Sequence, residues 1–186
     1  MTNKILLICG SAQEPSLNEK YLEIIEKNIA QRDGFETKVV RMRNLGLPLF
    51  LGYETSRGAA VEKWRETVAW ADGFVIASPE YDHALPAVLK NSFEHLDGVG
   101  YRDKPVMLLG ATTGRGGTLQ AQHSLYPILR TYGAWLMPDE LFIPRADKQI
   151  DGDGRVVEPA LAKRIEELTG KFLYSVEHFY RFRNSL

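Results

Sequence analysis

The sequence has one cysteine, no excess of either charge and no long hydrophobic run. The lone Cys9 excludes an intrachain disulfide and a zinc site built from cysteines. Among 186 residues, 23 Lys and Arg stand against 24 Asp and Glu, a net charge of −1. This balance argues against a sequence-independent nucleic-acid binder, which needs a large positive excess, and against a strongly acidic electron carrier.

The first apolar segment begins immediately after Lys4 and is too short for a secretory signal or a membrane span. We therefore expect a cytoplasmic protein that does not enter a membrane. At about 150 residues per domain, the length predicts a single domain over residues 1–186. A hydrophobic content of 44% is ordinary for a globular protein of this size.

Short apolar runs alternate along the chain with longer segments of helical periodicity. Leu17, Tyr21, Ile25 and Ile29 recur every four residues, as on the buried face of an amphipathic helix. Strands are expected at 5–9, 37–42, 73–77, 105–109 and within 135–143, and helices at 17–29, 57–71, 86–96, 120–132 and 159–179. This alternation predicts an α/β, three-layer, flavodoxin-like fold, with a five-stranded parallel sheet of order 2-1-3-4-5 and helices on both faces.

Ligands of such sheets bind at the carboxyl ends of the strands, so the loops that follow the strands are the candidate site. The first loop, 10–18, places Ser11, Ser16 and Asn18 near the start of a helix, where free N–H groups favour a phosphate. It has neither the Gly-Lys-Ser/Thr of a nucleotide-hydrolysing loop nor Gly-x-Gly-x-x-Gly. Ser16 is either a helix cap or part of a phosphate cradle.

The second loop, 78–86, is stiffened by prolines and exposes backbone N–H groups. Tyr81 is suited to lie beside a flat ring. His83 is either a catalytic group or a polar surface residue. Glu80 and Asp82 are either an acid–base pair or acceptors for neighbouring backbone N–H groups.

The third loop, 110–118, contains four glycines, which let a backbone approach a planar ligand, and Arg115, which suits a phosphate. The alternative is a mobile turn. The polar stretch 147–154 is expected to be a plain turn, because its spacing does not fit a calcium loop. Together, the three loops suit a phosphorylated flat cofactor, of which FMN is the obvious candidate.

Three motifs in these loops resemble those of the NADPH-dependent FMN reductase family, which includes quinone, chromate and azo-dye reductases. The motifs stand here as Gly-Ser-Ala-Gln-Glu-Pro-Ser-Leu-Asn at 10–18, Ser-Pro-Glu-Tyr-Asp at 78–82 with Pro-Ala-Val-Leu-Lys-Asn at 86–91, and Gly-Ala-Thr-Thr-Gly-Arg-Gly-Gly at 110–117. The resemblance covers nearly the whole chain, and the second motif is the most specific.

The resemblance implies FMN as cofactor, with its phosphate at the first loop and its ring between the other two. The cofactor-binding residues that it implies are Ser11, Gln13, Ser16, Leu17, Asn18, Pro79, Glu80, Tyr81, Asp82, Thr112, Thr113, Gly114 and Arg115. Two departures matter. Gln13 replaces the family's phosphate-pairing arginine, and Asp82 replaces an asparagine. No catalytic side chain is implied, because the flavin carries the chemistry.

The expected activity is oxidation of NADPH or NADH by bound FMN, followed by reduction of a quinone-like or other small-molecule acceptor in a ping-pong mechanism. The alternatives are a flavodoxin-type electron-transfer protein, or a family member that has lost FMN and acts as a binding module. The resemblance also implies a homodimer or a tetramer. Trp64, Trp70 and Trp135 are expected to be core or half-buried residues rather than interface residues, and the aromatics of 179–183 pack on a partner or on the sheet.

Overall fold

Buried apolar runs form the strands of a central parallel sheet in the computed structural model, which describes residues 2–96, 98 and 100–183. The strands are β1 (Asn3–Cys9), β2 (Phe35–Arg41), β3 (Gly73–Ala77), β4 (Pro105–Ala111), β5 (Trp135–Leu136) and β6 (Leu141–Ile143). The α-helices are α1 (Leu17–Ala30), α2 (Ala59–Trp70), α3 (Ala87–Glu94), α4 (Leu119–Thr131) and α5 (Pro159–Arg183), and the short 3-10 helices are η1 (Met42–Asn44), η2 (Tyr53–Thr55) and η3 (Ala146–Lys148).

The sheet order β2-β1-β3-β4-β5 confirms the predicted flavodoxin-like topology. The expected fifth strand, however, is divided in two, so the sheet has six strands rather than five. Both pieces run parallel to β4: Trp135 lies opposite Pro105, and Leu141 lies opposite Leu109. Between the two pieces stands Pro138, which has no N–H to donate to a strand ladder.

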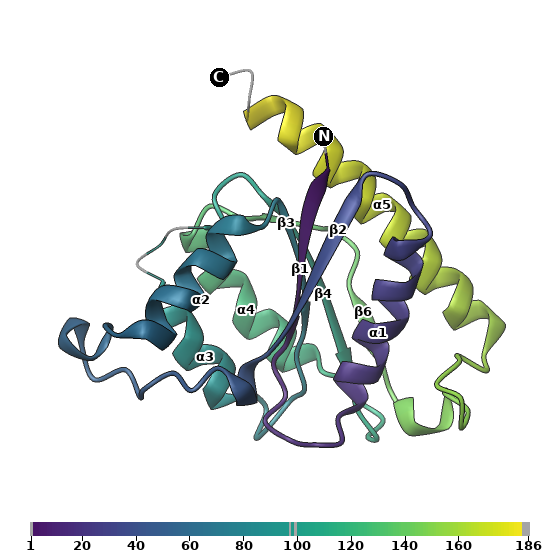
Figure 1. Ribbon diagram of the computed structural model, residues 1–186. Coiled ribbons are helices and arrows are strands. Elements are labelled where there is room, and N and C mark those ends of the chain that lie inside the picture. The colour runs from purple at the N-terminus through teal and green to yellow at the C-terminus, as the bar shows by residue number, and fades with distance from the viewer. Residues whose placement is uncertain (1, 97, 99, 184–186) are drawn as a thin grey trace.

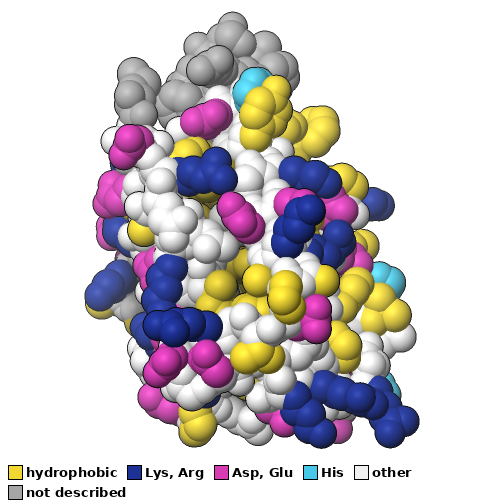
Figure 2. Space-filling view, turned by 90° about the vertical axis from the view of Figure 1, so that its right-hand side faces the viewer, with side chains coloured by type: hydrophobic (Ala, Val, Ile, Leu, Met, Phe, Trp, Pro, Cys, Tyr) yellow, Lys and Arg dark blue, Asp and Glu magenta, His cyan; other side chains and the backbone are white. Residues whose placement is uncertain are grey.

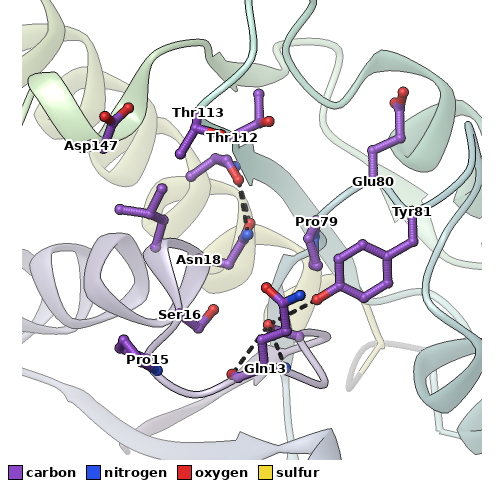
Figure 3. Close-up of a pocket in the computed structure, with 13 residues that line it drawn as sticks. Gln13, Pro15, Ser16, Asn18, Pro79, Glu80, Tyr81, Thr112, Thr113 and Asp147 are labelled. Atoms are coloured by element: carbon purple, nitrogen blue, oxygen red, sulfur yellow. Dashed lines mark hydrogen bonds between the residues drawn. The ribbon is translucent and has the colours of Figure 1, made fainter.

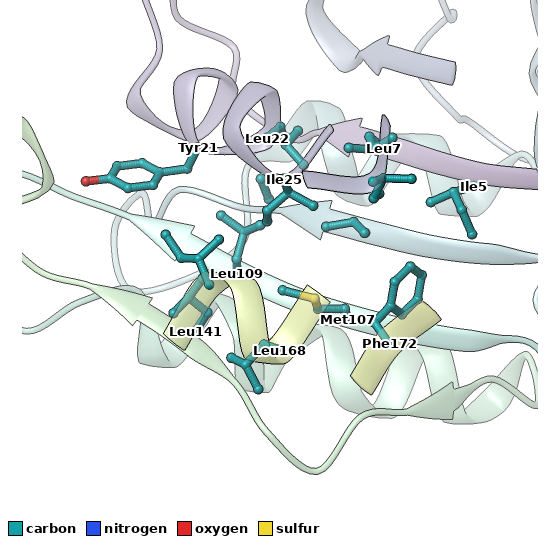
Figure 4. Packing of buried hydrophobic residues seen from close by; sticks show 14 of the residues in the cluster. Ile5, Leu7, Tyr21, Leu22, Ile25, Met107, Leu109, Leu141, Leu168 and Phe172 are labelled. Atoms are coloured by element: carbon teal, nitrogen blue, oxygen red, sulfur yellow. The ribbon is translucent and has the colours of Figure 1, made fainter. Parts of the chain in front are cut away.

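Helices cover both faces of the sheet, α1 and α5 on one and α2, α3 and α4 on the other (Figure 1). On the first face, Leu7 of β1, Ile25 of α1 and Phe172 of α5 meet in one buried cluster (Figure 4). Helix α5 lies directly on β3, because a Cβ at Gly73 would come within 3.1 Å of the Phe172 ring. Burial of this kind contributes about 25 cal/mol per Å² of apolar surface and fixes the strand ends that carry the loops.

The tryptophans differ in exposure. Trp64 is 1% exposed and donates its indole N–H to the Ser92 carbonyl at 2.9 Å. Trp70 is half-buried, as expected, but the expectation is wrong for Trp135, which is 52% exposed. Trp135 stands on a short edge strand and is covered on one side by Phe179, with ring centroids 4.6 Å apart. The other aromatic side chains of 179–183 lie outside the described residues.

The carboxyl ends of β1, β3 and β4 lie at one edge of the sheet, the lower edge in Figure 1, where the three candidate loops meet. On the face that carries α1 and α5, side chains of both charges are interspersed (Figure 2). None of the helices in the described residues is long and apolar enough to cross a bilayer.

Candidate functional site

A cavity of about 490 Å³ opens at this edge of the sheet, within the size range of small-molecule sites (Figure 3). It is lined by Ser11, Gln13, Pro15, Ser16, Leu17, Asn18, Pro79, Glu80, Tyr81, Ala111, Thr112, Thr113 and Asp147. Ten of the thirteen predicted residues are therefore brought together. The other three, Asp82, Gly114 and Arg115, are not among the lining residues.

The start of α1 offers free N–H donors to the cavity. Ser16 caps the helix, since its Oγ accepts the N–H of Glu19 at 3.4 Å. The first helical bond runs from Lys20 N–H to the Ser16 carbonyl at 3.2 Å, so the N–H groups of Leu17 and Asn18 have no acceptor within the helix. Two unfilled donors and the positive end of the helix dipole face the cavity, which is a setting that binds a phosphate.

Asn18 joins α1 to the end of β4. Its Nδ2 donates to the Ala111 carbonyl at 3.0 Å, and its Oδ1 accepts the Ala111 N–H at 3.0 Å (Figure 3). The side chain is 3% exposed. The Asn18 carboxamide is thus occupied by backbone, and what remains for an anion is chiefly the backbone N–H of this residue.

Ser11 and Tyr81 meet across the cavity. The Ser11 Oγ accepts the N–H of Gln13 at 3.1 Å and is hydrogen-bonded to the Tyr81 hydroxyl at 3.3 Å. The Tyr81 ring projects from the second loop into the cavity, toward the first loop (Figure 3). An aromatic ring in this position is suited to lie against a planar ligand.

Two arginines support the first loop from the end of β2. Glu19 is paired with Arg41 and with Arg43, the latter at 2.9 Å, and Arg43 also lies 3.2 Å from Glu14. Partial burial alone would raise the pKa of Glu19, but the hydrogen bonds from Arg41 and Arg43 outweigh it and hold that pKa below its ordinary value. The arginine charges are matched by carboxylates, so this loop brings little net positive charge to the cavity.

Glu80 caps a different helix. Its Oε2 accepts the N–H groups of Gln120 and Ala121, at 2.8 and 3.2 Å, at the start of α4. The carboxylate points away from the centre of the cavity (Figure 3). Of the two readings of Glu80, the structure supports backbone hydrogen bonding, although the N–H groups belong to a distant part of the chain.

Asp82 and His83 form the tip of a two-residue turn. Tyr81 and Ala84 exchange N–H···O bonds of 3.0 Å, and both tip residues have positive φ, 48° and 60°. This is the backbone of a tight hairpin turn. The His83 side chain is 89% exposed and lies 3.6 Å from Glu80, so it is a polar surface residue and not part of the cavity wall.

The third loop is tied down by backbone bonds and is not a free turn. Thr112 donates to the Ile143 carbonyl at 3.1 Å and accepts the Ala146 N–H at 2.9 Å. A glycine is required at 110, because a Cβ there would collide with the Thr118 side chain and lie 2.7 Å from the Ser78 carbonyl. The close approach of the backbone at this loop is therefore built into the packing.

Asp147 lines the cavity, although none of the three motifs includes it and the sequence placed it only in a polar stretch, 147–154, expected to be a plain turn. It belongs to η3, which Tyr21 anchors by donating its hydroxyl to the Ala146 carbonyl at 3.1 Å. Burial, with a smaller contribution from the Asp147 charge, raises the pKa of Tyr21 to about 12. No local pattern marks Asp147, since its position depends on this contact across the fold.

Cys9 ends β1 beneath the first loop and is fully buried. Burial raises the pKa of its thiol, and its Sγ lies 4.0 Å from the Ser16 Oγ. A buried thiol with a raised pKa is a poor nucleophile. Cys9 is thus a packing residue under the cavity.

Known proteins share both the sequence and the fold of this chain. Residues 3–148 match the NADPH-dependent FMN reductase family. The chain is 30% identical over 180 residues to the NADH:(hydroxy)cinnamate reductase subunit CrdA of Vibrio ruber, covering 92% of this chain and 86% of that protein. It is 33% identical over 147 residues to an NADPH azoreductase of a Bacillus species, covering 78% and 81%.

Among solved structures, FerB, a flavoenzyme NAD(P)H:(acceptor) oxidoreductase from Paracoccus denitrificans, superposes with a TM-score of 0.80. The match covers 96% of this chain and 99% of FerB at 20% identity, which establishes a shared fold. The family match spans most of the chain and includes all three loops that form the cavity. The chain belongs to the NADPH-dependent FMN reductase family.

Proposed function

We propose that the cavity binds FMN and that the protein is an NAD(P)H-dependent reductase of small, flat acceptors. The observation that carries this proposal is the cavity itself, which offers phosphate donors at one end and a slot between two backbone loops at the other. The described residues fit the group, since hydroxyls and free N–H groups meet at the start of α1 and the Tyr81 ring projects toward them.

The residues would share the binding as follows. The N–H groups of Leu17 and Asn18 and the hydroxyls of Ser11 and Ser16 would hold the phosphate. Backbone at Pro79 and Tyr81 on one side, and at Thr112 and Thr113 on the other, would hold the ring. When bound, FMN supplies two-electron redox chemistry, while the protein binds it, orients it and excludes competing reactions.

We infer that donor and acceptor use one open side of the cavity in turn, which is a ping-pong mechanism. NAD(P)H gives up a hydride and leaves as NAD(P)⁺; a quinone receives the two electrons and that hydrogen, takes one proton from solvent and leaves as a hydroquinone. The names of the relatives support flat, conjugated acceptors, since they include a (hydroxy)cinnamate reductase, an azoreductase and a 2-hydroxy-1,4-benzoquinone reductase.

The test is steady-state oxidation of NADPH and NADH by the FMN-loaded protein with 1,4-benzoquinone as acceptor. Parallel lines in double-reciprocal plots at several fixed quinone concentrations are expected for a ping-pong reductase. A protein that binds FMN but oxidises neither donor would instead be an electron-transfer protein. Intersecting lines would exclude the ping-pong order while leaving the reductase assignment intact.

We also propose that the protein is a homodimer. Three large apolar side chains, Leu49, Leu51 and Tyr53, are 69–76% exposed in one segment, which Asn91 anchors by accepting the Phe50 N–H at 2.9 Å. Apolar side chains that are exposed together in this way are typical of a protein–protein interface. Light scattering of the purified protein should give twice the 21.0 kDa mass of the chain. A monomer would contradict the proposal, and a tetramer would require a second interface.

A further inference from the structure

A second depression lies beside the cofactor cavity and is lined by basic side chains. Its volume is about 500 Å³, and Arg115, Arg145 and Lys148 line it together with Pro144, Gln149, Val157 and Glu158. Arg115 follows the third loop's Thr112 and Thr113, which line the cofactor cavity, and Lys148 directly follows Asp147, which lines it too. The two depressions therefore share a wall, made of the third loop and η3.

Backbone bonds hold this wall in place. Arg145 donates its N–H to the Gly114 carbonyl at 2.9 Å and accepts the Lys148 N–H at 2.9 Å. Arg145 itself has left-handed backbone, with φ 48° and ψ 40°, a conformation that is uncommon for a residue with a side chain. The strands and 3-10 helix thus bring Arg115, from one loop, and Arg145 with Lys148, from another, to one groove.

The groove has three cations against one carboxylate, Glu158, so its positive charge is only partly balanced. Across residues 2–96, 98 and 100–183, no ion pair joins Arg115, Arg145 or Lys148 to a carboxylate. The groove's own carboxylate, Glu158, accepts the Ala160 N–H at 3.3 Å. Elsewhere in the same part of the chain, cations such as Arg43 and Lys171 do have carboxylate partners. Three unpaired cations beside a cofactor cavity are a ready site for a multiply charged anion.

We propose that this basic groove binds the 2′-phosphate of NADPH and makes the enzyme prefer NADPH to NADH, an inference that rests on the proposed function. NADPH and NADH differ only in that phosphate, so a residue that contacts it affects the binding of NADPH and not that of NADH. Arginine is suited to the task, because its planar guanidinium can contact two phosphate oxygens at once. Because neighbouring residues of the third loop and η3 line both depressions, a donor with its phosphate in the groove would extend its nicotinamide toward the cofactor cavity.

The test is the triple variant Arg115→Gln, Arg145→Asn and Lys148→Gln, in which asparagine is chosen because it tolerates left-handed backbone. We expect the NADPH-to-NADH ratio of kcat/KM to fall by about tenfold to a hundredfold. Binding of adenosine 2′,5′-bisphosphate to the protein, measured by calorimetry, should weaken by a similar factor, while binding of 5′-AMP should not change. The matched control Lys27→Gln, Lys63→Gln and Lys163→Gln removes the same charge from other surfaces and should leave both ratios unchanged.

Three outcomes would overturn the proposal. The first is an unchanged ratio in the triple variant. The second is an equal loss for NADPH and NADH, which would place the shared pyrophosphate in the groove instead. The third is an equal effect of the control, which would mean that only net charge matters. FMN affinity, measured separately by fluorescence quenching, should match that of the wild type. A protein that binds no FMN would refute the proposed function, whereas the bisphosphate titration would still decide the role of the groove.

Discussion

The helices α1 and α4 both begin at the edge of the sheet that carries the cavity, but they differ in whether their first N–H groups have acceptors within the protein. At α4, the Glu80 carboxylate reaches across from the second loop and accepts the N–H groups of Gln120 and Ala121. At α1, Ser16 caps only the Glu19 N–H, and among the described residues the N–H groups of Leu17 and Asn18, which line the cavity, have no acceptor. One helix start already has an anion from within the protein, and the other is left for an anion from outside.

The phosphate site proposed at α1 therefore relies on no cation. The first loop carries Gln13 where the family has arginine, and its nearby arginines are matched by Glu14 and Glu19. Affinity for a phosphate at α1 must therefore come from N–H groups and the helix dipole. The basic groove works in the opposite way, through unpaired charges, and its binding should weaken more steeply with salt.

The largest expected effect comes from removing the bond between α1 and β4. In Asn18→Ala, the buried N–H and carbonyl of Ala111 lose both partners, so the free energy of unfolding should fall by about 2–4 kcal/mol. FMN binding should weaken as well, because the open N–H groups are no longer held against the cavity. Urea unfolding measures the first effect, with Asn28→Ala on the same helix as the control. A loss below about 0.5 kcal/mol would show that Asn18 does not hold the open helix start in place.

Adding a positive charge beside the start of α1 should tighten the binding of FMN. In Gln13→Arg, a guanidinium in the cavity should improve FMN affinity by about tenfold to a hundredfold and make that affinity more dependent on salt. Fluorescence titration at low and high salt measures both, and Gln31→Arg, at the far end of α1, serves as the control. An unchanged affinity would place the phosphate somewhere other than the first loop.

The ion pairs beneath the first loop should stabilise the fold only where Glu19 is ionised. Because the folded pKa of Glu19 lies below its unfolded value of about 4.3, its contribution is present above that pH and is lost as the pH falls through the folded pKa. Glu19→Gln should cost about 1 kcal/mol at pH 7 and much less at pH 3. Unfolding of both proteins at the two pH values tests this, with the exposed Glu23→Gln as control. An equal cost at both pH values would contradict the pKa shift.

The smallest effect is expected at the start of α4, where Glu80 already accepts the free N–H groups. Glu80→Gln keeps an oxygen near Gln120 and Ala121 but removes the charge that interacts with the α4 dipole, at a cost of about 0.5 kcal/mol. FMN affinity should stay within about twofold of the wild type, since the carboxylate points away from the cavity. Thermal unfolding and the FMN titration measure the two effects. A large loss of FMN affinity with unchanged stability would make Glu80 a direct ligand.

Sequence periodicity was most informative where burial alone decides structure. The strand β3 lies at the predicted 73–77, because its five residues form a short, fully buried run that is typical of a central strand. The edge of the sheet was more difficult to predict. The break around Pro138 divides one expected strand into β5 and β6, and the exposed Trp135 pairs with Phe179 through a tertiary contact that no local pattern contains.

The candidate site shows the same division. Loop positions followed from strand ends, so the motifs identified most of the cavity wall. The hydrogen bonds within the cavity wall could not be predicted, because they connect residues far apart in the sequence. Asn18 bonds to Ala111, Glu80 bonds to the start of α4, and Tyr21 positions Asp147 through η3. The sequence motif grouped Arg115 with the cofactor site, whereas the structure places its side chain in the neighbouring groove.

The comparison of FMN with riboflavin in one fluorescence titration tests the central claim most directly, because the two ligands differ only in the phosphate assigned to the start of α1. We predict that one FMN binds per chain and that riboflavin binds at least about a hundredfold more weakly, as expected for the loss of two or more charge-assisted hydrogen bonds. Equal affinities for the two, or no binding of FMN, would contradict the claim that the open N–H groups of Leu17 and Asn18 are a phosphate site.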